Sequence, residues 1–422
     1  MATLDMPYGR GAMPLHVPDA RLRAVIAPQR PAAASGTQED IVRAALARPI
    51  GSPPLHELAR GKRRVLIITS DHTRPVPSRI TMPLLLEQVR MGSPDADITI
   101  LMATGMHRAT TRDELIERFG ADIAEREHIV IHQAQRDEDM AYFGTLPSGG
   151  ELWLNRLAAQ SELVIAEGFI EPYFFAGFSG GRKSILPGIA SRKTVLYNHN
   201  AAFIASPNAR AGRLEGNPIH RDMVFAARQA KLAFILNVLI DEDKRVIAAV
   251  AGDCERAHEA GCAMCGRLNR AEPVVSDIAV TSNGGYPLDQ NLYQSVKGMT
   301  AAEACVRQGG VIIMCAALGD GHGGESFFRW FADRPDAQTV AADIESIPPG
   351  ETRMDQWEAQ ILARVMLRAT CIIVTGEENR ALVEQMHLRW APDADAALAM
   401  AEDLVGADAS VTVIPNGVGV IL

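Results

Sequence analysis

Runs of β-branched and aliphatic residues recur along this chain, and segments with helical spacing of apolar residues separate them. Strands that alternate with helices in this way form parallel sheets covered by helices on both faces. The pattern therefore predicts an α/β fold. The predicted strands are residues 65–69, 98–102, 163–166, 232–239, 278–281, 311–314 and 372–374.

The chain has 422 residues, more than one hydrophobic core usually holds, so we expect two α/β domains with an active-site cleft between them. A long helical stretch ends near residue 272, which divides the chain into an N-terminal domain, 1–272, and a C-terminal domain, 273–407. A last strand at about 408–422 is expected to return to the first domain. Pro/Gly/Ala-rich segments at 28–35 and 345–350 are predicted loops.

Two helix starts carry local signals. Thr111 and Glu114 have the spacing of a capping box, and Gly120 would end the helix that this box begins. Asn217 followed by Pro218 is typical of another helix start.

Composition limits the class of function. Apolar residues make up 47% and charged residues 22%, as in globular proteins, and no apolar run reaches the roughly 18–20 residues of a membrane span. The first residues lack a secretory signal, so we expect a cytoplasmic protein with six reduced cysteines. A net charge of −9 disfavours nucleic acid and leaves a small acidic ligand as the expected partner.

Polar residues follow three of the predicted strands, where ligands bind in parallel sheets. Asp71 and Arg74 follow the first of these strands. They fit either an internal ion pair or a clamp that holds a ribose and a carboxylate. His107 follows the second and has the pKa range of a general base, although an exposed loop histidine is the plainer interpretation. His72, beside Asp71, is the next histidine candidate.

A glycine-rich segment, 177–184, follows the third strand and combines small residues, hydroxyls and two cations. It suits a phosphate or another anion, and equally a glycine-rich turn with solvated charges. It is not a Walker loop, because Arg182 stands where that loop has glycine and Pro187-Gly188 disturbs the helix that should follow.

His199 is a candidate metal ligand, but a lone histidine is a weak metal signal. Cys254, His258, Cys262 and Cys265 share one face of a predicted helix. One straight helix spreads them over roughly 16 Å, so they cannot surround one ion. We interpret them as a packed face, with a Cys-x-x-Cys redox pair as the minor alternative.

In the second half, residues 291–298 bring Tyr293, Gln294 and Lys297 close together after a strand and a Gly-Gly-Tyr-Pro turn. Tyr293 and Lys297 lie one helical turn apart on the same face. The plainer alternative is an amphipathic helix start with a solvated lysine.

Together these segments resemble the nickel-pincer lactate racemase family over essentially the whole chain. The most specific part is AGFSGGRKSILPG at 176–188, supported by DHTRP at 71–75, TGMHR at 104–108 and YQSVKG at 293–298. The resemblance implies a racemase or epimerase of a 2-hydroxy acid, which passes the C2 hydride to a nickel-pincer nucleotide cofactor held mainly by the N-terminal domain. It also implies enzymes that make this cofactor as partners.

The resemblance assigns roles to individual residues. Lys183 would hold the cofactor covalently and His199 would bind nickel. Asp71 would orient the cofactor, and Ser179, Gly180 and Gly181 would lie near its phosphate. Arg74, Gln294 and Lys297 would hold the substrate, and Tyr293 and Trp357 would line the site. His107 would take the hydroxyl proton of the substrate, as one of two catalytic histidines in the family.

Tyr173 departs from the family pattern, because it replaces the second catalytic histidine. A phenol is a poor base at neutral pH unless its pKa is depressed. Either Tyr173 acts as the second acid or base, or His72 takes that task, or the substrate is not lactate. We expect a substrate other than lactate, with Tyr173 still in the site.

Two other functions fit the sequence less well. One is a nickel-free enzyme that binds a phosphorylated or nucleotide ligand at the Lys183 loop. The other is a non-catalytic binding protein, against which the joint presence of His107, Lys183, His199 and Lys297 argues.

Overall fold

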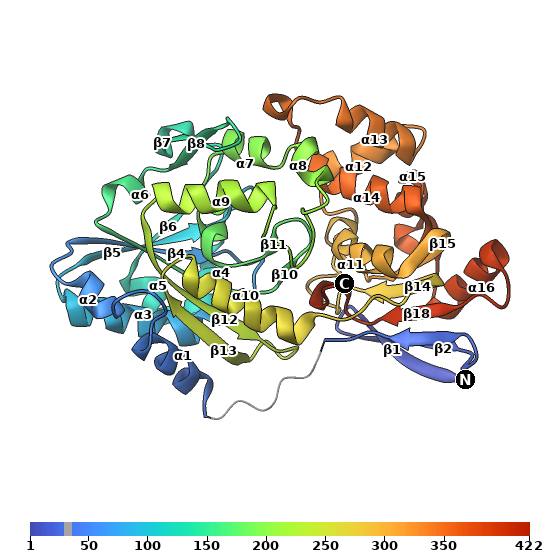
Figure 1. The fold of residues 1–422 in the computed structure, drawn as a ribbon, viewed down its shortest axis with the longest axis horizontal. Coiled ribbons are helices and arrows are strands. Elements are labelled where there is room, and N and C mark those ends of the chain that lie inside the picture. Colours follow the sequence, from blue (N-terminus) through green and yellow to red (C-terminus); the bar gives the residue numbers. More distant parts are fainter. Residues whose placement is uncertain (29–35) are drawn as a thin grey trace.

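The computed structural model describes residues 1–28 and 36–422, so most of the predicted loop at 28–35 lies outside the described residues. Two six-stranded sheets lie side by side, the first at the left of Figure 1 and the second at the right. The first sheet has the order β13-β12-β9-β4-β5-β6 and is parallel except for β13. Its strands are β4 (Arg64–Ser70), β5 (Asp97–Ala103), β6 (His128–Ile131), β9 (Leu163–Phe169), β12 (Leu232–Ile240) and β13 (Val246–Gly252).

The apolar runs form strands because both faces of this sheet are covered. Val65 and Ile67 of β4 pack into one core, whereas Leu66 and Ile68 point into another on the opposite face. A strand buried on both faces has no polar alternation, which is the pattern of the sequence. The helices of this half are α1 (Gln38–Ala47), α2 (Leu55–Ala59), α3 (Ser78–Gly92), α4 (Arg112–Phe119), α5 (Ala121–Arg126), α6 (Leu157–Gln160), α7 (Arg192–Asn198), α8 (Ala201–Ala205), α9 (Pro218–Gln229) and α10 (Arg256–Asn269).

The second sheet is parallel throughout, in the order β17-β16-β15-β14-β18-β3. Its strands are β3 (Leu22–Val25), β14 (Ser276–Ser282), β15 (Val306–Cys315), β16 (Ala369–Val374), β17 (Arg389–Ala391) and β18 (Val411–Ile414). The helices of this half are α11 (Leu292–Cys305), α12 (Glu325–Ala332), α13 (Ala337–Glu345), α14 (Gln356–Arg368), α15 (Arg380–Gln385) and α16 (Ala394–Val405).

Both ends of the chain pack with the second half of the molecule, and β3 and β18 join its sheet, which corrects the predicted division. The last strand, β18, lies between β14 and β3 and does not return to the first domain. All four of its residues are buried, so it is stable only in the interior of a covered sheet. The N-terminal hairpin of β1 (Ala2–Tyr8) and β2 (Gly11–Val17) packs into a core of this half, so residues 2–25 do not join the first sheet.

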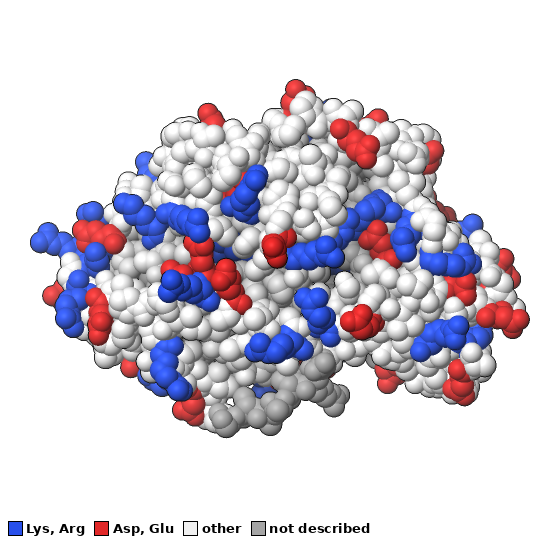
Figure 2. Space-filling view, in the orientation of Figure 1, with Lys and Arg blue, Asp and Glu red and all other residues white. Residues whose placement is uncertain are grey.

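Several local predictions are confirmed. The seven predicted strands all exist, Thr111 and Glu114 form the capping box of α4, which ends at Gly120, and Asn217 caps α9. Short hairpins pair β7 (Met140–Thr145) with β8 (Glu151–Asn155), and β10 (Pro172–Tyr173) with β11 (Gly177–Phe178). Among the described residues, no helix is long and apolar enough to span a bilayer. On the face shown in Figure 2, lysine and arginine are interspersed with aspartate and glutamate.

Candidate active site

The strand order reverses beside β4 in the first sheet, because β5 lies on one side of it and β9 on the other. The loops after such strands diverge and leave a crevice at their carboxyl ends. Asp71, His107 and Glu171 follow β4, β5 and β9, so this reversal brings three distant segments together. The second sheet reverses in the same way beside β14, and α11, which carries Lys297, begins after that strand.

Asp71 and His107 form a hydrogen-bonded pair. Nδ1 of His107 lies 2.7 Å from Oδ2 of Asp71, and the Thr73 hydroxyl donates to Oδ1 at 2.6 Å. Burial alone would raise the pKa of Asp71, but the His107 hydrogen bond and the charges of His107 and Arg74 hold it well below the ordinary value. An ionised carboxylate only accepts hydrogen bonds, so the proton lies on Nδ1 and Nε2 remains an acceptor. This is the orientation that a general base requires.

Arg182 fixes the glycine-rich loop that follows β9. Its side chain is almost fully buried and donates to the carbonyl oxygens of Phe178 and Ala176, each at 2.7 Å, and to Nδ1 of His220 at 3.1 Å. A buried guanidinium requires such partners, because its charge has left water. Arg182 is therefore the structural cation of the loop, and the predicted alternative of a solvated charge does not apply to it.

The groups expected around a phosphate also hold this loop. The Ser179 hydroxyl donates to the Phe169 carbonyl at 2.9 Å and accepts from the Glu171 amide at 2.9 Å. The Gly181 amide donates to Asn237 at 2.8 Å. Gly180 and Gly181 have φ of +74° and +52°, and a Cβ on Gly180 would lie 2.6 Å from Asn237 Oδ1. Their requirement for glycine is explained by close packing, and nothing in this geometry favours a phosphate at Ser179 or Gly181.

Lys183 lies against the ring of Tyr173. Its Nζ is 3.0 Å from the centroid of the Tyr173 ring and 5.9 Å from that of Phe175. Burial, together with the charges of Arg74, Arg182 and Lys297, lowers the pKa of Lys183 well below its ordinary value. An uncharged amine is a nucleophile, so this lysine has the chemistry needed for a covalent bond to a cofactor.

His199 is buried between two aromatic rings, at the end of α7. Its ring centroid lies 5.2 Å from those of Phe175 and Trp357, and both pairs are edge-on. Nδ1 is buried and has no hydrogen-bond partner among the described residues. Burial and the charge of Lys183 lower the pKa of His199 to about 3, so the imidazole is neutral. A neutral imidazole with an unused nitrogen is a competent metal ligand, and the aromatic walls exclude water.

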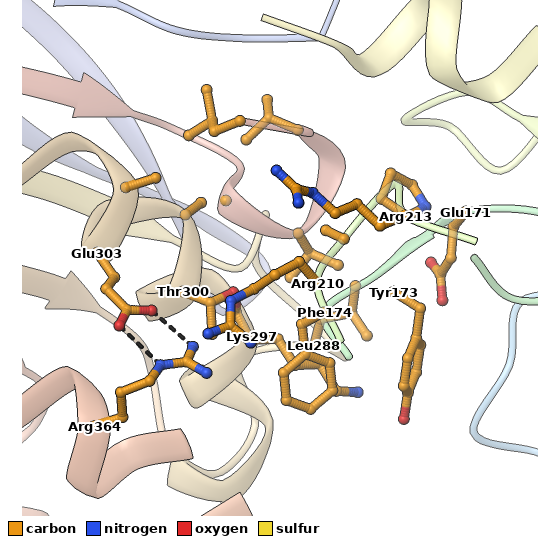
Figure 3. Close-up of a pocket in the computed structure, with 18 of the residues that line it drawn as sticks. Glu171, Tyr173, Phe174, Arg210, Arg213, Leu288, Lys297, Thr300, Glu303 and Arg364 are labelled. Atoms are coloured by element: carbon orange, nitrogen blue, oxygen red, sulfur yellow. Dashed lines mark hydrogen bonds and ion pairs between the residues drawn. The ribbon is translucent and has the colours of Figure 1, made fainter. Parts of the chain in front are cut away.

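Arg74 and Lys297 line one cavity of about 520 Å³ with Tyr173, between the two halves of the chain. Figure 3 shows Lys297 and Tyr173 among its lining residues. Nζ of Lys297 donates to Oε1 of Gln294 and lies 5.8 Å from the Tyr173 ring. Burial and Arg74 lower the pKa of Lys297, whereas Glu358 opposes this shift. Two cations at one end of a cavity match the carboxylate of a small acid.

Tyr293 and Trp357 form a hydrogen-bonded pair beside His199. Nε1 of Trp357 donates to the Tyr293 hydroxyl at 2.9 Å, which joins α14 to α11. Burial raises the pKa of Tyr173 above that of a free phenol, and the opposing charge of Arg74 does not offset it. Tyr173 is consequently a neutral phenol, in a position to donate a hydrogen bond.

Sequence reasoning missed two carboxylates, the buried Glu358 and the partly buried Glu171. Burial raises the pKa of both, and the largest opposing charges are Arg74 for Glu171 and Lys297 for Glu358. They balance the cations of the site, and Oε1 of Glu358 has no hydrogen-bond partner among the described residues. The position of Glu171 directly after β9 was the available signal, because the other polar residues of the site also follow strands.

Two further candidates lie apart from this cavity. His72 turns toward Glu114, 3.8 Å away, and neither His72 nor His107 is among the residues that line the cavity with Arg74 and Tyr173. The predicted packed face is confirmed for His258, Cys262 and Cys265, which are buried on α10, whereas Cys254 is buried but precedes the helix. Burial raises the pKa of Cys262 and of Cys265 to about 12, which leaves both unreactive. Within residues 1–28 and 36–422, no three histidine, cysteine or acidic side chains could hold a metal ion together.

Comparison with known proteins identifies the family. The lactate racemase N-terminal domain matches residues 8–212, and the lactate racemase C-terminal domain matches residues 271–422. The chain is 51% identical to the lactate racemase of Thermoanaerobacterium thermosaccharolyticum (100% of this chain, 99% of the relative). It is 48% identical to that of Lactiplantibacillus plantarum (100% of both).

The solved structures agree with this assignment. The lactate racemase apoprotein from T. thermosaccharolyticum superposes with a TM-score of 0.96 at 51% identity, covering 100% of this chain and 99% of that one. A Thermotoga maritima protein shares the fold alone, with a TM-score of 0.67 at 20% identity over 90% and 97% of the chains. The α/β chain described here belongs to the lactate racemase family of isomerases.

Proposed function

We propose that this protein interconverts the enantiomers of lactate with a nickel-pincer nucleotide cofactor. The observation that carries the proposal is the joint position of Arg74, Lys297 and Tyr173 in one cavity, with Lys183 directly against Tyr173. We expected another substrate because of Tyr173. Full-length identities of 51% and 48% to two lactate racemases favour lactate instead.

The residues around Lys183 and His199 fit such a cofactor. Lys183 offers an amine of lowered pKa for a covalent bond, and His199 offers a neutral imidazole with an unused nitrogen for nickel. Tyr293 and Trp357 would line the pocket, and Asp71 would orient the cofactor. When bound, the cofactor supplies the acceptor and donor of the C2 hydride. Cofactor-making enzymes are therefore required as partners.

The chain's own residues would bind the substrate and move its proton. Racemisation requires the hydroxyl proton and the C2 hydride to leave, and then to return on either face. Arg74 and Lys297 would hold the carboxylate, and Gln294 would position Lys297. Arg74 Nη1 lies 3.2 Å from the Thr73 hydroxyl, which is 3.3 Å from His107 Nδ1, so the carboxylate site and the base are contiguous.

In this arrangement Nε2 of His107 accepts the hydroxyl proton while Asp71 stabilises the imidazolium that forms. The neutral phenol of Tyr173 donates a hydrogen bond within the site. The alternative of a phosphorylated ligand at the glycine-rich loop is disfavoured, because the Ser179 hydroxyl and the Gly181 amide are already bound.

Three measurements test the proposal. Expression beside the cofactor-making enzymes should add mass at Lys183 and one nickel per chain, and Lys183→Arg should abolish both. The loaded protein should convert either pure enantiomer of lactate to a racemic mixture, faster than it converts dicarboxylic, aromatic or sugar 2-hydroxy acids. No added mass and no nickel would refute the cofactor assignment. Racemisation of another acid but not of lactate would refute the substrate.

A further inference from the structure

The cavity that contains Arg74 and Lys297 extends to a second group of cations. Three further arginines from two segments line its wall: Arg210 and Arg213 from the loop before α9, and Arg364 from α14 (Figure 3). Glu171 and Glu303 are the acidic side chains among the described residues that line the cavity, whereas six arginine and lysine side chains do so. The cavity therefore has an excess of positive charge along its length.

The positive charge of Arg210, Arg213 and Arg364, the outer arginines, is only partly neutralised by neighbouring groups. Arg364 forms a two-pronged pair with Glu303, at 2.8 and 2.7 Å, which uses that carboxylate. Nη1 of Arg210 donates to the carbonyl oxygens of Ser206 and Ala209. Among residues 1–28 and 36–422, no carboxylate lies within 4.0 Å of Arg210 or Arg213.

Arg210 and Arg364 lie near enough to interact, and Arg213 is exposed at the outside. Burial, followed by the charge of Arg364, lowers the pKa of Arg210 to about 10. Holding like charges together in one cavity is unfavourable unless an anion is bound between them for part of the time. Structural arginines are usually neutralised by acidic partners, and among the described residues the one ion pair of this set joins Arg364 to Glu303.

We propose that Arg210, Arg213 and Arg364 form an outer carboxylate subsite, which holds a 2-hydroxy acid on its way to and from Arg74 and Lys297. The proposal rests on the function proposed above. The inner cations hold the carboxylate for reaction, and the outer arginines raise its local concentration at the mouth of the cavity. A guanidinium suits this task, because it binds carboxylates through two parallel hydrogen bonds and stays charged at all relevant pH values.

The test compares Arg213→Gln and Arg210→Gln with Arg23→Gln, which removes an exposed arginine of β3 outside the cavity. In the loaded enzyme at low ionic strength, kcat/KM for lactate should fall by about threefold to tenfold in the two cavity variants, mainly through KM. The loss should shrink as salt rises, because screening weakens the same field in the wild type. Arg23→Gln should follow the wild type.

A second measurement is independent of turnover. Cofactor-free protein is titrated with L-lactate by saturation-transfer NMR, and inorganic phosphate is added as a competitor. Binding should weaken at least threefold in Arg213→Gln and remain in Arg23→Gln, with near-UV circular dichroism confirming the fold. Unchanged binding together with an unchanged salt profile would overturn the subsite.

Two outcomes distinguish this subsite from the proposed function and from a binding site for the nucleotide phosphate. If the loaded protein fails to racemise lactate, the proposed function fails, and the NMR titration still decides whether the arginines bind a carboxylate. If loading the cofactor abolishes the competition between phosphate and lactate at these arginines, they hold the phosphate of the nucleotide. That outcome would overturn the subsite for substrate.

Discussion

Nζ of Lys183 lies 3.0 Å from the centroid of the Tyr173 ring, so the residue that departs from the family pattern directly covers the lysine expected to hold the cofactor. A ring in this position shields the amine from water, which favours its uncharged form. Lys183 and Tyr173 therefore act on each other, whichever acid the enzyme binds.

Tyr173→Phe keeps this ring and removes only the hydroxyl. Because the raised pKa of Tyr173 keeps it protonated, we expect the loss of a hydrogen bond, and kcat should fall by about tenfold equally in both directions. Enantiomer-resolved initial rates measure this. Tyr173→His, which places a titratable ring at the same position, is the comparison. A loss of a hundredfold or more in both directions would instead make Tyr173 an acid or base.

Asp71→Asn should remove the hydrogen bond that orients His107 as a base. The amide no longer fixes the proton on Nδ1 of His107, so kcat should fall by about 10²- to 10⁴-fold. Asp113→Asn, on the exposed first turn of α4, is the control. Wild-type activity in Asp71→Asn would exclude the pair from catalysis.

The free energy of unfolding of Asp71→Asn should depend on pH less than that of the wild type. The pKa of Asp71 is lowered by folding, so its ionised form stabilises the protein above the unfolded value near 3.8, and this contribution is lost as the pH falls below it. The difference in unfolding free energy between wild type and Asp71→Asn should shrink in urea titrations from pH 6 to pH 3. A difference that grows toward acid would contradict the assignment.

Glu358→Gln should shift the alkaline limb of the pH dependence of KM for lactate to lower pH. Lys297 must be protonated to hold a carboxylate, its pKa is already lowered, and Glu358 opposes that shift. Without Glu358 the lysine loses its proton at lower pH, so KM for lactate should rise about threefold to tenfold in mildly alkaline buffer. Glu384→Gln, on exposed α15, is the control. An alkaline limb that stays in place would exclude this coupling.

His199→Leu should abolish nickel binding and stabilise the cofactor-free protein. An unpartnered buried nitrogen destabilises the cofactor-free protein, so its removal should raise the free energy of unfolding by about 1 kcal/mol while nickel content falls to background. His220→Leu is the matched contrast, since its Nδ1 accepts from Arg182 and its removal should destabilise. Full nickel content in His199→Leu would exclude His199 as the metal ligand.

Arg182→Met should destabilise the cofactor-free protein by about 3–5 kcal/mol, because several buried carbonyl groups lose their donor at once. Arg221→Met, an exposed arginine of α9, should change stability by less than about 0.5 kcal/mol. Urea unfolding measures both. Equal stabilities would show that the loop closes without Arg182.

The sequence by itself determined the strands, the helix starts at Thr111 and Asn217, and the position of Asp71 and His107 at strand ends. These follow from local physics: apolar runs, capping side chains and the edge of a parallel sheet at which loops emerge. Motif order was enough to identify the family.

Only the tertiary structure decided the rest, because the deciding contacts join residues far apart in the chain. It placed β18 and β3 in the second sheet, and it turned Ser179 and Gly181 into internal partners of the loop. Glu358 became part of the site because α14 packs beside α11. Burial depends on what covers a side chain, and no pattern of neighbouring residues around Lys183 or His199 records the rings that enclose them.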